Sequence, residues 1–96
     1  MSNVTKEKLK KYFSVTEQAL EKAKKSSENI QITDKTRADF IDMVERYLSD
    51  AKYFERKKDF VNAFAAINYA HGWLDAGART GIFNVKDSKL FTVDDD

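Results

Sequence analysis

The chain has 96 residues, of which 42% are hydrophobic and 34% are charged, a balance typical of a globular domain rather than a disordered chain. It contains no cysteine, which excludes disulfides, thiolate nucleophiles and cysteine-based zinc sites. Seventeen basic and sixteen acidic residues give a net charge of +1, so overall charge does not favour nucleic acid or anionic lipid as a partner.

The N-terminal sequence, MSNVTKEKLKKYF, lacks the apolar core and the small-residue cleavage site of a signal peptide. No apolar run reaches the ~18 residues that a membrane span requires. We therefore expect a cytoplasmic protein with no membrane partner.

Helix breakers are rare in this chain. Proline is absent, and the three glycines fall at positions 72, 77 and 81, so residues 1–71 contain neither strong breaker. This pattern favours long helices, and we expect three of them, over approximately 5–29, 34–56 and 60–80.

Each expected helix has residues suited to its ends. The side-chain oxygen of Thr5 can cap the first helix, Thr33 or Asp34 the second, and Asp59 the third, because each can accept a hydrogen bond from a free backbone N–H. Gly81 suits the left-handed residue that ends the third helix.

Apolar and small residues recur at alternating steps of three and four in all three segments. Such a 3.5-residue repeat indicates helices that cross at a shallow angle of about +20°, and short connections make neighbouring helices antiparallel. We predict an all-α fold, an antiparallel up-down-up three-helix bundle in a single domain over residues 1–96. The repeating positions are Leu9, Phe13, Thr16, Leu20, Ala23, Ser27 and Ile30; Phe40, Val44, Tyr47, Ala51 and Phe54; and Phe60, Ala63, Ile67, Ala70, Leu74 and Gly77.

The pattern changes in the C-terminal segment, residues 82–96, where apolar and polar residues are interleaved before three final aspartates. The segment is too apolar for a free tail. We expect it to be partly extended and to pack on the bundle. The alternative is docking onto a second chain, which would make a swapped dimer.

The run DFVNAFAAINYAHGWLDAGARTGIF, the LFTV that follows it and the upstream VERYLSDAKYF resemble a family of short archaeal proteins, domain of unknown function number 357. The likeness extends from about Tyr12 to Val93, and its specific part is the third-helix block. The resemblance implies a small three-helix bundle in an archaeal cytoplasm. It implies no activity, ligand or catalytic residue.

Four polar residues, Asn68, His71, Asp75 and Arg79, follow one strip of the third helix. At i, i+4 spacing the carboxylate can orient the imidazole and raise its pKa, and Arg79 can hold an anion. The same pairs also stabilise an ordinary helix face, and no nucleophile or second acid accompanies them. We therefore assign no catalytic residue and keep the strip as a candidate for anion or partner binding.

The third helix also carries Tyr69, Gly72 and Trp73, which with nearby alanines form a second small or apolar face. Two neighbouring helices cannot both cover it, so the C-terminal segment or another chain must do so. Gly72 costs about 1 kcal/mol relative to alanine inside a helix, so we expect either close packing or a bulky neighbour there.

Metal and nucleic-acid sites are weakly supported. A metal site would need carboxylates from another helix, such as Asp39, Asp42 or Glu45, beside the single histidine, and we expect no metal and no cofactor. The first helix has seven lysines against four glutamates. These lysines spread around the helix, so nucleic-acid binding is possible but not favoured.

The sequence therefore favours a non-enzymatic protein–protein interaction module that binds a protein partner or self-associates, without establishing whether it also has an enzymatic activity. The alternative function is binding of RNA or a small anionic ligand by His71, Asp75 and Arg79.

Overall fold

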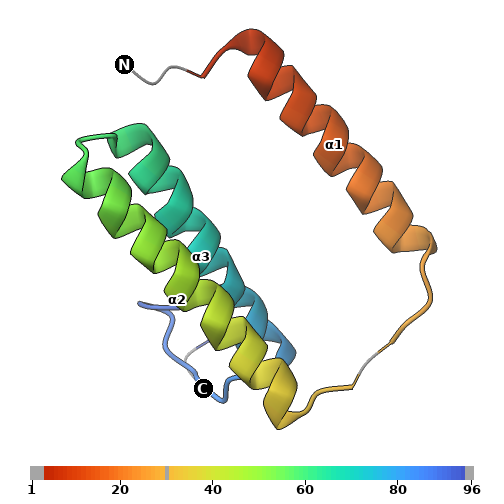
Figure 1. Cartoon of the computed structure of the whole chain (residues 1–96). Helices are drawn as coiled ribbons and strands as arrows, with labels where there is room; N and C mark the ends of the chain where they lie inside the picture. Colours follow the sequence, from red (N-terminus) through yellow and green to blue (C-terminus); the bar gives the residue numbers. More distant parts are fainter. Residues whose placement is uncertain (1–3, 30, 95–96) are drawn as a thin grey trace. The chain divides into compact units, whose positions relative to one another are not determined.

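The structure is a computed structural model that describes residues 4–29 and 31–94. Three helices follow along the chain, α1 (Lys6–Lys25), α2 (Asp34–Arg56) and α3 (Phe60–Thr80), and the described ranges contain no strand (Figure 1). The predicted all-α class is thus confirmed. The chain forms two compact units, Met1–Ile30 and Gln31–Asp96, called here the N-terminal and the C-terminal unit; the single domain stays a prediction.

Helix α1 makes up most of the N-terminal unit. It begins after Thr5, whose Oγ1 accepts a hydrogen bond from the backbone N–H of Lys8 at 3.1 Å, as predicted. Leu9, Phe13 and Leu20 lie along one side of the helix, at the predicted spacing.

The predicted end of this helix, at residue 29, is wrong, because α1 stops at Lys25. The backbone N–H and the hydroxyl of Ser26 both donate to the carbonyl of Ala23, at 3.2 and 2.7 Å. A serine side chain that bonds the preceding turn competes with helical continuation. Ser27 therefore falls outside the helix, and Ile30 lies outside the described residues.

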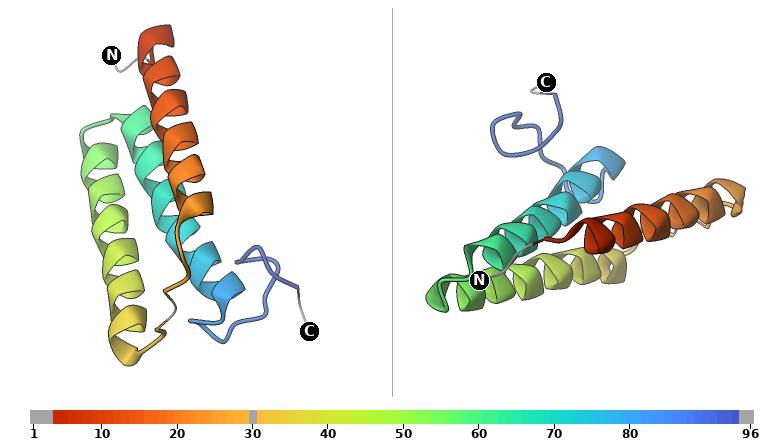
Figure 2. Two further views of the ribbon diagram at one scale, coloured as in Figure 1. Left: turned by 90° about the vertical axis from the view of Figure 1, so that its right-hand side faces the viewer. Right: turned by 90° about the horizontal axis from the view of Figure 1, so that it is seen from above.

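Helices α2 and α3 have the predicted bounds and pack side by side in opposite directions (Figures 1 and 2). The side chains of Thr33 and Thr36 cap α2 reciprocally. At the start of α3, Asp59 Oδ1 accepts from the backbone N–H of Asn62 at 3.2 Å. Both helices therefore begin where a side-chain oxygen satisfies a free N–H.

The interface between α2 and α3 has small residues at its centre. Ala51 of α2 and Ala66 and Ala70 of α3 are buried, and their short side chains let the two backbones approach closely. Pairs of aromatic rings also join the two helices. The rings of Phe40 and Trp73 contact each other edge to face at a centroid distance of 4.9 Å, and those of Tyr47 and Tyr69 do so at a centroid distance of 4.5 Å. Such pairs add about 0.5–1.5 kcal/mol each beyond the area they bury.

The face that α3 presents to α2 differs from the predicted repeat. Tyr69 and Trp73, expected on a second face, contact α2. Of the predicted series, Ala70 and Gly77 are buried, whereas Phe60 and Ile67 are 65% and 48% exposed. The α2 series is buried or half-buried throughout, as predicted.

Residues 82–94, called here the strap, fold back onto the C-terminal half of α3 (Figure 1). Gly81 ends α3 at φ 82°, a left-handed conformation that glycine adopts without a steric cost. The backbone N–H of Phe83 then donates to the carbonyl of Gly77 at 3.1 Å, and the Phe83 ring lies against Gly77. The expectation that this segment packs on the helices is confirmed for the strap; residues 95–96 lie outside the described residues.

Among the described helices, none combines the length and the apolar character needed to cross a bilayer.

Two glycines of α3 allow a matched test of this packing. An alanine Cβ at Gly77 would collide with ring carbons of Phe83, whereas no described atom lies within 4 Å of a Cβ at Gly72. We expect Gly77→Ala to lower the free energy of unfolding by about 1–3 kcal/mol, because it overfills the contact. Gly72→Ala should raise the same quantity by about 1 kcal/mol, because alanine is the better helix former.

Urea denaturation followed by circular dichroism measures both variants. A Gly77→Ala variant that is as stable as the parent, or more stable, would contradict this account of Gly77. A destabilising Gly72→Ala would mean that another surface packs closely on Gly72.

Candidate functional site

The predicted polar strip of α3 holds the strap in place. Asp75 Oδ1 accepts from the backbone N–H of Thr92 at 2.8 Å, and Asp75 Oδ2 accepts from the Thr92 hydroxyl at 2.9 Å. Arg79 Nη1 donates to the Thr92 carbonyl at 3.1 Å. We call these three residues the clasp; it engages both backbone groups and the side chain of Thr92.

Local structure places each partner of the clasp. Asp75 and Arg79 share a face of α3 because they are four residues apart. In the strap, the carbonyl of Asp87 accepts from the N–H groups of Leu90 and Phe91, at 3.1 and 2.9 Å. Its carboxylate accepts from the N–H of Lys89 at 2.9 Å. This aspartate-based turn redirects the chain and brings Thr92 back to α3.

The clasp also sets the electrostatics of Asp75. The backbone hydrogen bond from Thr92 is the main reason why the pKa of Asp75 lies below its ordinary value of 3.8; the Thr92 hydroxyl, His71 and Arg79 act in the same direction. Partial burial opposes them. The carboxylate is therefore held in its charged form by the groups that fix the strap.

The geometry does not favour His71 and Asp75 as a catalytic pair. His71 Nε2 lies 3.6 Å from Asp75 Oδ1, beyond hydrogen-bond length, while the shorter contacts of Asp75 go to Thr92.

The remaining predicted site residues lie elsewhere on α3. Tyr69 and Trp73 contact α2, Asn68 and Gly72 are exposed, and their roles in binding stay predictions.

A hollow of about 800 Å³ lies between the C-terminal half of α3 and the strap. Its lining includes His71 and Arg79 from α3, and Lys86, Lys89, Phe91 and Asp94 from the strap. The sequence offered no signal for the strap's part in this site, because Thr92 is seventeen residues from its partner Asp75.

Within residues 4–29 and 31–94, no group of three or more histidine, aspartate or glutamate side chains is placed to hold a metal ion. Of the carboxylates considered for a metal, Asp42 pairs with Arg46 at 2.9 Å.

In a comparison with known protein families, residues 11–83 match a family described as protein of unknown function (DUF357). The chain belongs to this family. The match covers most of α1 and all of α2 and α3, and ends at the residue that packs on Gly77. No curated protein and no solved structure matches the chain. The resemblance to this family is confirmed as far as Phe83.

Asp75→Ala tests the clasp because it removes both acceptors of Thr92. Hydrogen bonds to a charged group contribute about 1.5–3 kcal/mol each, so hydrogen-exchange protection of the Thr92 amide should fall at least about tenfold. Amide exchange followed by NMR measures this effect. Asp42→Ala, which removes an exposed carboxylate from α2, is the control, and equal protection in the two variants would rule out the clasp.

The low pKa of Asp75 predicts how the clasp responds to acid. A carboxyl group whose pKa is lower in the folded state stabilises the fold above its unfolded-state pKa, and that stabilisation is lost as the pH falls through the folded-state value. The stability difference between the parent and Asp75→Ala should shrink as the pH falls below about 3.8, where the carboxyl group of Asp75 takes up its proton. Urea midpoints from about pH 5 downward measure it; a difference that does not shrink in this acid range would contradict the assignment.

Proposed function

We propose that this DUF357 protein is a non-enzymatic protein-interaction module whose contact surface lies on α3. The observation that carries the proposal is the lack of charge along this helix. From Phe60 to Leu74, α3 contains no Asp, Glu, Lys or Arg, although much of this stretch is exposed in the C-terminal unit. An exposed helix of a soluble domain ordinarily carries charged residues on its outer face.

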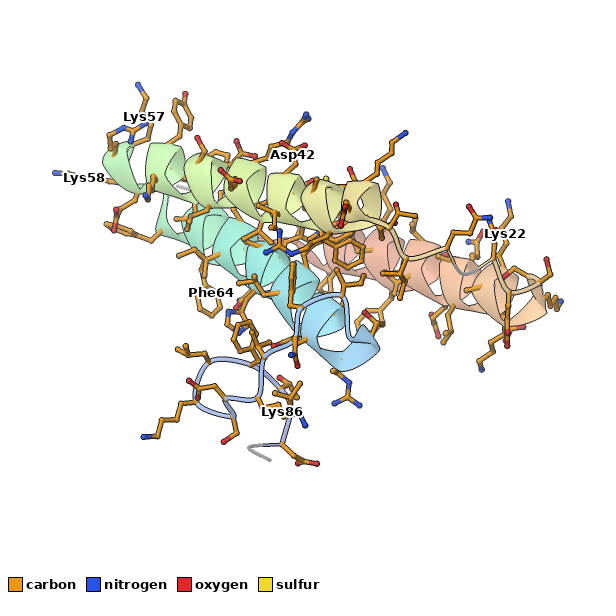
Figure 3. The ribbon with its side chains drawn as sticks, turned by 90° about the horizontal axis from the view of Figure 1, so that it is seen from below. Lys22, Asp42, Lys57, Lys58, Phe64 and Lys86 are labelled. Carbon is orange, nitrogen blue, oxygen red and sulfur yellow. The ribbon has the colours of Figure 1, made fainter. Side chains whose placement is uncertain are left out.

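The uncharged surface has an apolar centre. Phe60, Phe64 and Ile67, called here the open strip, follow steps of four and three, and Phe64 is 69% exposed. Figure 3 shows Phe64 projecting from α3 on the side away from α2. The strap holds the polar residues Asp75 and Arg79 farther along the helix. One end of α3 is thus fastened to the strap, while the other presents apolar side chains.

The spacing of the open strip indicates the kind of partner. Residues at steps of four and three fit an amphipathic helix whose apolar residues have the same repeat. The chain contains a helix of this type, since α1 carries exposed Leu9, Phe13 and Leu20 at that spacing. A second copy of the chain is therefore the first partner to test.

The alternative function, binding of RNA or an anion by His71, Asp75 and Arg79, is less well supported by this strip alone. Asp75 repels anions, and both of its carboxylate oxygens are engaged with Thr92. Cytoplasmic location and archaeal origin stay predictions from the sequence.

Phe64→Asp tests the open strip. Burying a phenylalanine contributes about 1.5–3 kcal/mol, so charging this position should weaken self-association at least about tenfold. Sedimentation velocity over a range of protein concentrations measures the change. Ser49→Asp, which adds the same charge at an exposed position of α2, is the control and should leave the dissociation constant unchanged.

A parent protein that stays monomeric at every concentration, and that loses thermal stability in Phe64→Asp, would overturn self-association. The open strip would then be covered within its own chain.

A further inference from the structure

We propose that the hollow between α3 and the strap binds a small phosphorylated ligand. The site is separate from the open strip and does not depend on the interaction function. The hollow is open to solvent and has a volume of about 800 Å³, which leaves room for a small ligand. All its lining residues belong to the C-terminal unit.

The charge of the lining selects an anion. Three permanent cations, Arg79, Lys86 and Lys89, border the hollow, whereas Asp94 is the one carboxylate among its described lining residues. Lys86 lies in the strap (Figure 3), as does Lys89, so the strap and α3 both contribute cations to the lining of the hollow. Like charges gathered in this way repel one another, and an anion between them removes that cost.

Two features favour a phosphate on an organic body. Arg79 uses Nη1 for Thr92, and a guanidinium has five N–H donors, so further donors are left for phosphate oxygens. A phosphate with two negative charges matches several cations better than a carboxylate with one. Phe91, Leu90 and Val85 add apolar surface to the lining, which suits a ring or another apolar group attached to the phosphate.

Binding and closure of the strap are coupled in this arrangement. The strap supplies Lys86 and Lys89, and the clasp at Thr92 holds it against α3. A ligand that contacts both the strap and α3 binds the closed form in preference, so it stabilises the clasp. The ligand should therefore increase the hydrogen-exchange protection of the Thr92 amide.

NMR titration of the full chain with adenosine 5′-monophosphate, inorganic phosphate and adenosine tests the proposal. We expect saturable shifts of the amides of residues 85–94 with the two phosphates, tighter binding of the nucleotide, and the weakest binding of adenosine. Nucleotide binding should also weaken as salt is raised. The proposal would be overturned if adenosine bound as tightly as the nucleotide. It would also be overturned if neither the nucleotide nor inorganic phosphate caused saturable shifts.

Two variants and a matched control locate the site. Lys86→Ala combined with Lys89→Ala should raise the dissociation constant of the nucleotide at least tenfold, whereas Asp94→Asn should lower it because a repelling charge is removed. Lys24→Ala combined with Lys25→Ala removes the same charge from α1 and should have no effect. An equal loss of affinity in both double variants would show general attraction to a basic protein and would refute a site in the hollow.

Discussion

The close contact between α2 and α3 is the constraint on which the rest of the C-terminal unit depends. Ala51, Ala66 and Ala70 are buried at its centre, and residues this small let two helices meet with their backbones near each other. Larger rings also join the two helices, as where Phe40 meets Trp73 edge to face. Because α2 takes this side of α3, the open strip is left uncovered by α2, and Phe83 of the strap packs on Gly77 beside Phe40 of α2.

The strap is attached to α3 at two places by different interactions. Phe83 fixes the strap at Gly77 by packing, and Thr92 fixes it at Asp75 and Arg79 by hydrogen bonds. Hydrogen bonds at an exposed site open at a lower free-energy cost than a packed core does. The hydrogen-bonded end of the strap is therefore where the proposed ligand would act, while Phe64 belongs to the surface proposed for a protein partner. Both proposed roles are binding, and neither needs the nucleophile that the polar strip lacks.

The sequence by itself determined the elements whose causes are local. It predicted the bounds of α2 and α3, because the caps at Thr33 and Asp59 and the glycine at position 81 act within a few residues of the chain. It also predicted the apolar series of α2, where one repeat of large residues stands out from charged neighbours. The prediction of the end of α1 failed because the hydroxyl of Ser26 bonds the Ala23 carbonyl. The residue type alone does not say whether a serine makes this bond or lets the helix continue.

Only the tertiary structure decided which face of α3 meets α2 and what the polar strip does. The one predicted series of α3 contains both the buried Ala70 and Gly77 and the exposed Phe60 and Ile67, so its heptad spacing does not say which of its residues face α2. In the structure Ala70 and Gly77 are buried, and Phe40 and Tyr47 of α2 pack on Trp73 and Tyr69. The pairing of Asp75 with Thr92 depends on two chain reversals between them, so no local pattern encodes it. Periodicity and capping act over one or two turns of helix, whereas a binding site is assembled from residues that only packing brings together.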